Sequence, residues 1–195
     1  MANFNTFSYL VLKLEGGYQA HSSDTGNYNS LNQLVGTNLG ISAPVYENWV
    51  GYPPSVSDMK AITKQTANAI YKVLYWDKIN GDNIKSQETA NIIADHAVNA
   101  GVGSAGKIVQ RTLNKHFGEN LAVDGVIGNK TTQAINKVKT APFFDAILAA
   151  RESFYKSLNK PEFLQGWLHR LQPFYEDAIR LSQKYAKPFF FQLFQ

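Results

Sequence analysis

Glu15 stands where a helix is expected to end, a position at which a carboxyl group could do acid chemistry. Apolar side chains recur at helical spacing over residues 4–14, and Gly16 and Gly17 then stop the helix. The C-terminal end of a helix carries partial negative charge, which disfavours an ionised carboxylate there. A carboxylic acid that stays protonated near neutral pH is what a general acid for glycosidic cleavage requires. The alternative interpretation is an ordinary surface glutamate before a glycine cap.

Asp24 is the second candidate carboxylate, in the turn-like sequence Asp-Thr-Gly. As the base of an inverting reaction it would hold a water molecule, with roughly 6.5–9.5 Å between the two carboxyl groups. The alternative is an Asx turn, in which the side chain bonds its own backbone. Thr37 could position the same water or bind a sugar, and its alternative role is a loop cap. Both residues are candidates for the catalytic set with Glu15.

Aromatic side chains and one amide are candidates for substrate binding. Tyr18, Tyr71 and Tyr75 offer flat rings with a polar tip that could stack on sugars. Tyr71 and Tyr75 are four residues apart, so they share one face of a helix. Asn99, at the end of its helix, could face the same cleft. We expect Trp76 in the core and Asp95 as a buried brace of the fold.

The candidate residues belong to a series of motifs that keeps one order along the chain. The motifs are Glu15-Gly16-Gly17-Tyr18, Asp24-Thr25-Gly26, Thr37-Asn38-Leu39-Gly40-Ile41, Ala69-Ile70-Tyr71, Tyr75-Trp76-Asp77, Asp95-His96-Ala97-Val98-Asn99-Ala100-Gly101, Asp124-Gly125-Val126-Ile127-Gly128 with Thr131, and Gly166-Trp167 with Arg170. This series resembles the N-acetylmuramidases of glycoside hydrolase family 108 over roughly residues 4–180.

The resemblance implies a lysozyme-like peptidoglycan hydrolase. It would cleave the β-1,4 bond between N-acetylmuramic acid and N-acetylglucosamine, with Glu15 protonating the leaving oxygen. Two departures stand out. Asn27 occupies a position where the family usually has a glycine, with a longer segment before Thr37, and Leu14 stands where a histidine often precedes the glutamate. The change at Asn27 and the longer segment affect the lip of the expected cleft. The change at Leu14 removes a histidine beside the acid. Glu15 itself is retained.

A second part of the chain resembles small peptidoglycan-binding modules. Residues 124–131 look like the loop between helices in those modules, a tight turn that feeds a helix N-terminus. The alternative is a structural turn. We therefore expect a lysozyme-like catalytic lobe over residues 1–101 and a peptidoglycan-binding-like helical lobe over 102–195, packed as one compact unit.

The pattern predicts a mainly α fold, with a long polar loop or small irregular hairpin over residues 16–41 after the first helix. No alternation is sustained enough to build a sheet. Further helices are expected over residues 43–49, 63–76 with Thr63 as cap, 86–100 with Ser86 as cap, 105–116, 129–139 with Asn129 as cap, 142–158, and from Pro161 onward with a break at Pro173.

Composition excludes several classes of protein. The 195 residues carry a net charge of +4 that is scattered rather than clustered, so we expect no nucleic-acid binding. Cysteine is absent, which excludes disulfides and thiolate metal sites. The four histidines are isolated from one another and from acidic clusters, so we predict no metal and no cofactor.

The sequence also shows no pattern typical of a signal peptide or of a membrane-spanning segment. The start of the sequence lacks a basic region, and no run approaches the roughly 20 apolar residues that span a membrane. We therefore expect a monomer, made in the cytoplasm without a signal peptide, that reaches the cell wall or periplasm after release or export by another system. This is typical of endolysin-like proteins of phage or bacteria.

Two other functions stay open on the sequence alone. A lytic transglycosylase also uses one glutamate but makes an anhydro product without water. A non-catalytic peptidoglycan-binding or scaffold protein could keep the fold without turnover. The aromatic segment at residues 188–194 is expected to pack on the domain.

Overall fold

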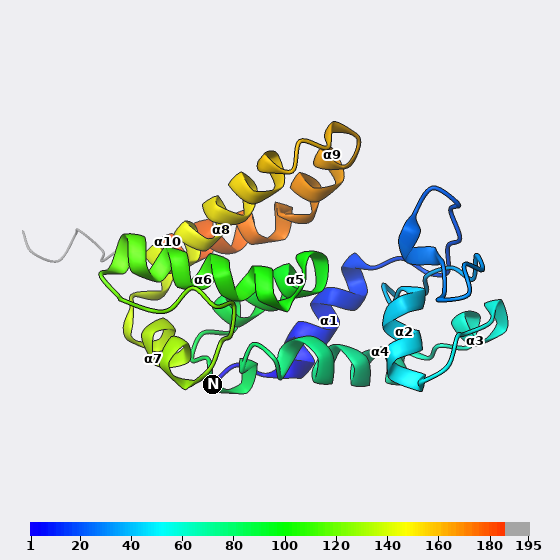
Figure 1. Ribbon diagram of the computed structural model, residues 1–195. Coiled ribbons are helices and arrows are strands. Elements are labelled where there is room, and N and C mark those ends of the chain that lie inside the picture. The colour runs from blue at the N-terminus through cyan, green and yellow to red at the C-terminus, as the bar shows by residue number, and fades with distance from the viewer. Residues whose placement is uncertain (186–195) are drawn as a thin grey trace, which may run out of the picture. The chain divides into compact units, whose positions relative to one another are not determined.

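The structure, a computed structural model, describes residues 1–185, and the aromatic segment 188–194 lies outside these residues. The described part is mainly helical (Figure 1). Its α-helices are α1 (Phe4–Leu14), α2 (Ala43–Val50), α3 (Val56–Lys60), α4 (Lys64–Tyr71), α5 (Gln87–Ala100), α6 (Val102–Phe117), α7 (Asn129–Lys137), α8 (Thr140–Ser157), α9 (Pro161–Arg170) and α10 (Gln172–Tyr185).

The mainly α, lysozyme-like fold class is confirmed, and β pairing in residues 1–185 is limited to three isolated bridges. The chain forms two compact units. The N-terminal unit is Phe4–Asp77, and the C-terminal unit combines Met1–Asn3 with the chain from Lys78 onward. Helix α5, which the division at residue 101 assigns to the first lobe, packs in the C-terminal unit against α6 and α8. The lobes at 1–101 and 102–195 stay a prediction.

Aromatic stacking forms the core of the N-terminal unit. Phe7 and Trp76 are fully buried, and their rings stack with centroids 5.5 Å apart and an interplanar angle of 24°. Phe4 adds an edge contact to Trp76 at 5.9 Å. Helix α1 is therefore held by its apolar face against the end of the helix that carries Trp76. The expectation that Trp76 belongs to the core is confirmed.

The helix that carries the paired tyrosines changes its winding midway. Thr63 caps its start, since its hydroxyl accepts from the Thr66 N–H at 3.1 Å. The α-helical part ends at Tyr71, and a π-helical turn follows over Lys72–Trp76, closed by the Asp77 N–H bonding the Lys72 carbonyl at 2.9 Å. The helix expected over residues 63–76 with Thr63 as its cap is thus confirmed, with its last part wound as a π-helix. Short π segments of this kind are frequent at functional sites.

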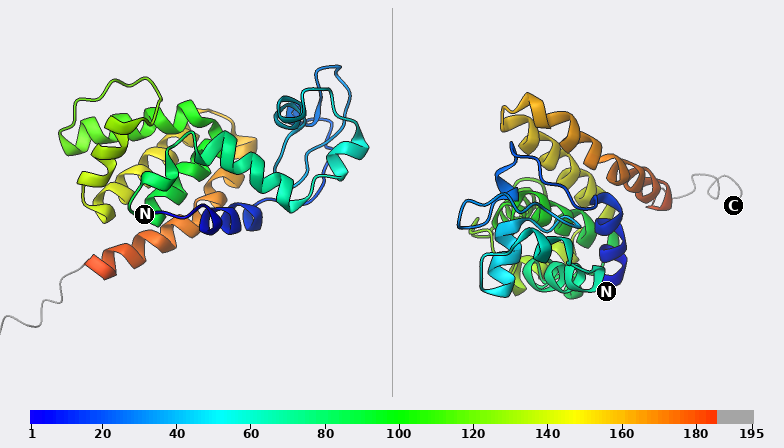
Figure 2. Two further views of the ribbon diagram at one scale, coloured as in Figure 1. Left: turned by 90° about the horizontal axis from the view of Figure 1, so that it is seen from below. Right: turned by 90° about the vertical axis from the view of Figure 1, so that its right-hand side faces the viewer.

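Helix α5 is the centre of the C-terminal unit. Ser86 caps it, because its hydroxyl accepts from the Thr89 N–H at 3.1 Å, and every residue from Thr89 to Ala97 is buried. Helices α6 and α8 pack on it, and α10 runs along α8 (Figures 1 and 2). A helix covered on this many sides must be apolar around most of its circumference, which explains its run of alanine and isoleucine.

Two predicted helix boundaries in this unit have different outcomes. The break at Pro173 is confirmed, because α9 ends at Arg170 and Pro173 stands in the first turn of α10, where its missing N–H costs nothing. The prediction that Asn129 caps its helix is wrong by one position. Gly128 is the cap residue and Asn129 is the first helical residue.

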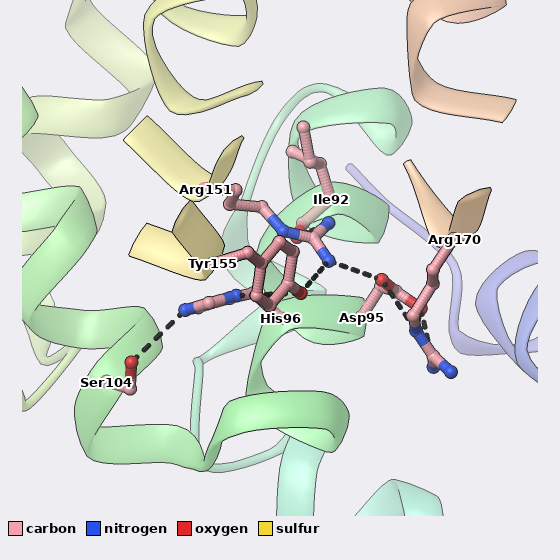
Figure 3. Close-up of polar contacts among 7 residues, drawn as sticks. All are labelled: Ile92, Asp95, His96, Ser104, Arg151, Tyr155 and Arg170. Atoms are coloured by element: carbon pink, nitrogen blue, oxygen red, sulfur yellow. Dashed lines mark hydrogen bonds and ion pairs between the residues drawn. The ribbon is translucent and has the colours of Figure 1, made fainter. Parts of the chain in front are cut away.

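A buried carboxylate joins three helices of this unit (Figure 3). Asp95 of α5 pairs with Arg151 of α8 at 2.7 Å and with Arg170 of α9 at 2.8 Å, and neither Asp95 nor Arg151 is exposed. Arg151 also donates to the Ile92 carbonyl at 3.1 Å and to the Tyr155 hydroxyl at 3.0 Å. Removing one partner of a pair buried this way costs about 3–5 kcal/mol. The expectation that Asp95 braces the fold is confirmed.

His96 lies beside this ion pair and is held neutral. Its Nε2 lies 3.1 Å from the Ser104 hydroxyl, and its Nδ1 lies 3.4 Å from the Tyr155 hydroxyl. Burial, with a further contribution from the charge of Arg151, lowers the pKa of His96 from 6.5 to about 3, against the opposing effect of Asp95. His96 is therefore uncharged in the folded protein at neutral pH.

We predict that His96 makes the protein less stable as the pH falls from 6.5 toward 3. In this window the unfolded chain takes up a proton that the folded chain refuses, so the free energy of unfolding drops by up to about 1.4 kcal/mol per pH unit. Denaturant unfolding at several pH values measures the free energy of unfolding. In His96→Gln this free energy should fall less steeply with decreasing pH than in the wild type. The exposed His169→Gln is the control and should keep the wild-type dependence on pH. The same dependence of the unfolding free energy on pH in all three proteins would show that His96 does not cause the loss of stability.

Candidate active site

The segment between α1 and α2 folds back on itself as an irregular hairpin. Gln19 and Thr37 exchange two backbone hydrogen bonds of 2.9 and 2.8 Å, and isolated bridges also join Tyr28 with Leu34 and Asn38 with Ile41. The predicted small irregular hairpin is therefore confirmed. It belongs to the N-terminal unit and brings residues from both of its arms back toward the end of α1.

Two side-chain amides brace this hairpin from within. The Gln19 Nε2 donates to Asn27 Oδ1 at 3.0 Å, and the Asn27 Nδ2 donates to Gln19 Oε1 at 2.9 Å. Asn27 is fully buried and also donates to the His21 carbonyl at 2.9 Å. The residue that replaces the family's usual glycine thus fills the loop with a satisfied polar group. Asn27 was expected only as a departure from the family pattern, and its bracing role was not predicted.

Glu15 is the first residue after α1, and its N–H closes the last turn on the Val11 carbonyl at 3.0 Å. Its side chain lies against Gly40, at the tip of the second hairpin arm. Gly40 has φ +73°, and a Cβ built there would come within 2.6 Å of the Glu15 Cγ and Cδ and 2.3 Å of the Tyr71 hydroxyl. The close approach of three groups from distant parts of the chain therefore requires a residue without a side chain.

Two tyrosines complete the surroundings of the acid. The Tyr71 hydroxyl donates to the Leu39 carbonyl at 2.9 Å, which ties the Gly40 turn to α4. Tyr75 stands on the π-helical turn with its ring 6.0 Å from that of Tyr71. Burial and then the negative charge of Glu15 raise the pKa of the Tyr75 hydroxyl. We call Glu15, Gly40, Tyr71 and Tyr75 the Glu15 cluster.

Tyr18 lies on the hairpin rather than in this cluster. Its hydroxyl donates to the Val35 carbonyl at 3.1 Å, and its ring covers Gly36, where a Cβ would come within 2.7 Å of it. The Lys60 ammonium stands 4.9 Å from the ring centroid. The half-buried ring therefore has structural contacts, and its role in substrate binding stays a prediction.

Asp24 occupies an exposed turn on the first arm of the hairpin. Its Oδ1 accepts from the Gly26 N–H at 2.9 Å, an Asx turn, and its Oδ2 is 3.4 Å from the Gln19 side-chain amide. Gln19 is also the backbone partner of Thr37, so Asp24 and Thr37 are linked through one residue. Both of the interpretations given to Asp24 remain compatible with this geometry.

Asn99 belongs to the C-terminal unit, where it is exposed in the last turn of α5. The described structure therefore brings together Glu15, Tyr71 and Tyr75 among the predicted site residues. It places Tyr18, Asp24 and Thr37 on the adjoining hairpin. The contact of Asn99 with substrate stays a prediction.

The loop at residues 124–131 in the C-terminal unit is held by a single buried amide. Gln110 of α6 donates to Asp124 Oδ1 at 2.7 Å and to the Val126 carbonyl at 3.1 Å, and accepts from the Gly125 N–H at 2.8 Å. Hydrogen bonds from the Val126 N–H and Gln110 lower the pKa of Asp124. A cavity of about 350 Å³ adjoins the loop. The hydrogen bonds favour a structural turn here.

Neither a metal-binding cluster nor a membrane-spanning helix occurs among residues 1–185. Among residues 1–185 no group of three or more histidine, aspartate or glutamate side chains could hold a metal ion. In the same residues no helix has both the length and the apolar character needed to cross a bilayer.

Known proteins are similar to both parts of the chain. Residues 9–101, which contain the Glu15 cluster, match the model of the family "Glycosyl hydrolase 108", and residues 104–172 match the model "Predicted Peptidoglycan domain". The solved structure of Brucella abortus SagA is similar, with a TM-score of 0.77 and 29% identity over 94% of this chain and 98% of that chain. No curated protein matches the sequence.

The protein is therefore a glycosidase of the lysozyme type. Its two parts together make it a peptidoglycan hydrolase. More particularly, residues 9–101 match the glycosyl hydrolase 108 model and residues 104–172 match the peptidoglycan domain model, and the resemblance to family 108 inferred from the motifs is confirmed.

We predict that Gly40→Ala lowers turnover strongly because the new methyl group must displace either the Glu15 side chain or the Tyr71 hydroxyl. The positive φ adds strain of about 1 kcal/mol. Gly51→Ala is a matched control, since Gly51 has φ +81° in the same unit but no atom within 4 Å of its Cβ position. Both variants should lose stability in thermal melting from the positive φ, Gly40→Ala by about 1–3 kcal/mol more because of the overlap, and only Gly40→Ala should lose lysis at a temperature where both are folded. Equal lysis by the two variants would show that the contact does not position Glu15.

Proposed function

We propose that the protein is an N-acetylmuramidase that cleaves the β-1,4 bond between N-acetylmuramic acid and N-acetylglucosamine, with Glu15 as general acid. The observation that supports this most is the placement of the Glu15 side chain against Gly40 and Tyr71, next to Tyr75. This carboxyl group lies in the part of the chain that matches the glycosyl hydrolase 108 model. Its backbone and side-chain neighbours fix its position before substrate arrives, which is what efficient proton transfer requires.

The proposed reaction begins with proton donation by Glu15 to the glycosidic oxygen. The C–O bond breaks, its electron pair goes to the leaving oxygen, and positive charge develops on the sugar ring as an oxocarbenium-like transition state. Water then bonds to the anomeric carbon and releases a proton, for which Asp24 is the proposed acceptor. Thr37, whose backbone is fixed by Gln19, is proposed to orient this water.

The tyrosines take different parts in this proposal. Tyr71 is fully buried, so its hydroxyl bond to Leu39 serves to hold the turn beside Glu15. Tyr75 and Tyr18 are half-buried and keep ring surface for contact with sugars. Asn99 is proposed as an additional substrate contact from the C-terminal unit.

We predict that wild-type digests of purified peptidoglycan in ¹⁸O-labelled water contain labelled reducing ends on muramic acid. Glu15→Gln should lower this product by about 10²–10⁴-fold, because the amide is nearly isosteric but has no acidic proton to give. Mass analysis of the fragments measures both results, and thermal melting checks that the variant is folded.

Other products would overturn parts of the proposal. Unlabelled anhydro-muramic fragments would indicate a lytic transglycosylase that still uses Glu15. Binding of peptidoglycan without any fragments would indicate a non-catalytic protein. Lysis by Glu15→Gln above about a tenth of the wild-type rate would place the acid elsewhere.

We predict that Asp24→Ala lowers kcat strongly and lowers the melting temperature only slightly. A residue that accepts the proton of water affects turnover directly, whereas a turn residue costs about 1 kcal/mol of stability and affects turnover only through the loop. Asp24→Asn separates the two roles, because an amide keeps the acceptor for the Gly26 N–H but cannot take a proton. Near-normal kcat in Asp24→Asn would make Asp24 a turn residue alone.

A further inference from the structure

A groove runs between α6 and α8 in the C-terminal unit, away from the loop at residues 124–131. Its volume is about 610 Å³, and the two helices that form it pack directly on each other. They can be followed in green and yellow in Figure 1. The groove lies within the part of the chain that matches the peptidoglycan domain. We call it the α6–α8 groove.

One wall of the groove is cationic. Arg111, Lys115 and His116 of α6 line it, and all three are exposed. None of them forms an ion pair with another residue in the part of the chain that the structure describes. Lys115 and His116 stand in the last turn of α6, where the helix dipole favours positive charge, but Arg111 lies well before that turn. Stabilisation of the helix dipole therefore explains basic residues at 115 and 116 but does not explain Arg111.

The opposite wall is made of small side chains. Ala146, Ala149 and Ala150 of α8 leave the space that a longer side chain would fill, and Phe154 adds an apolar surface. A ligand with methyl-sized side chains would fit this wall without leaving voids.

A threonine hydroxyl also lines the groove. Thr112 is 5% exposed and lines the groove, and its hydroxyl has no hydrogen-bond partner among residues 1–185. Other threonines of the same unit, such as Thr132 with the Gly128 carbonyl at 3.0 Å, bond their own helix. The Thr112 hydroxyl is not one of the buried side-chain atoms left without a partner, so it remains accessible from the groove. Thr112 thus offers a ligand one uncharged hydrogen-bonding group beside the cationic wall.

We propose that the α6–α8 groove binds the peptide stem of peptidoglycan. The stem combines free carboxylates with alanine methyl groups, which match the cationic wall and the small-residue wall in turn. Arg111 and Lys115 bind the carboxylates, Thr112 bonds a main-chain amide, and the alanine methyls pack on α8. The proposal rests on peptidoglycan as the substrate but not on the bond that is cleaved or on Glu15 as the acid.

Binding of a synthetic stem tetrapeptide, L-Ala-γ-D-Glu-meso-diaminopimelate-D-Ala, to the full chain tests the proposal by calorimetry. The double variant Arg111→Gln/Lys115→Gln should bind at least about tenfold more weakly than the wild type, since charged hydrogen bonds are lost. Lys78→Gln/Lys107→Gln removes the same charge from exposed positions outside the groove and should bind as the wild type does. Ala149→Leu should also weaken binding, because it fills the groove without changing any charge.

The contrary outcomes are separable. Equal affinity of the wild type and the Arg111/Lys115 double variant, or equal affinity for a tetrapeptide with amidated carboxylates, would overturn the proposal. So would binding of duplex DNA, but not of the tetrapeptide, through these two cations. Glycan strands stripped of peptide give the remaining control. The groove variants should cleave them at the wild-type rate and cleave intact peptidoglycan more slowly, whereas failure of the muramidase proposal would abolish labelled products from both substrates.

Discussion

The C-terminal unit depends on one carboxylate that has no access to water. Asp95 must be charged to hold Arg151 and Arg170, and each of those cations comes from a different helix. Because an unpaired charge is so costly in this position, α5, α8 and α9 have one arrangement that satisfies it. The peptidoglycan domain around the α6–α8 groove is therefore built on a framework whose helices are fixed by charge as well as by apolar packing.

In the N-terminal unit the backbone, rather than a buried ion pair, fixes the arrangement of the segments around Glu15. Glu15 is positioned by the end of α1, by the Gly40 turn and by a tyrosine whose hydroxyl is already bonded to Leu39. The hairpin that carries Gly40 is closed by main-chain bonds between Gln19 and Thr37. A site assembled this way is set before the substrate enters, since its key distances follow from the fold rather than from flexible side chains.

Local signals were enough to predict much of this structure. The glycines after Glu15, the caps Thr63 and Ser86 and the break at Pro173 act within a few residues, so the sequence shows them directly. The π-helical turn was missed because residue types alone do not distinguish a bond to the carbonyl five residues back from one to the carbonyl four residues back, although it turns Val73 outward while Trp76 stays buried. The partners of Gly40 and of Asp95 were missed because they come from 25 to 75 residues away, and residue types alone do not reveal which distant segments will meet.

The amide pair of Gln19 and Asn27 has a consequence for how the enzyme responds to its surroundings. Both groups are neutral at every pH that a protein survives, and bonds between neutral groups are little affected by salt. The hairpin therefore keeps its shape while nearby carboxylates gain or lose protons and while the ionic strength changes. In a peptidoglycan hydrolase this gives the hairpin a brace whose bonds stay the same when the candidate acids Glu15 and Asp24 change their protonation state.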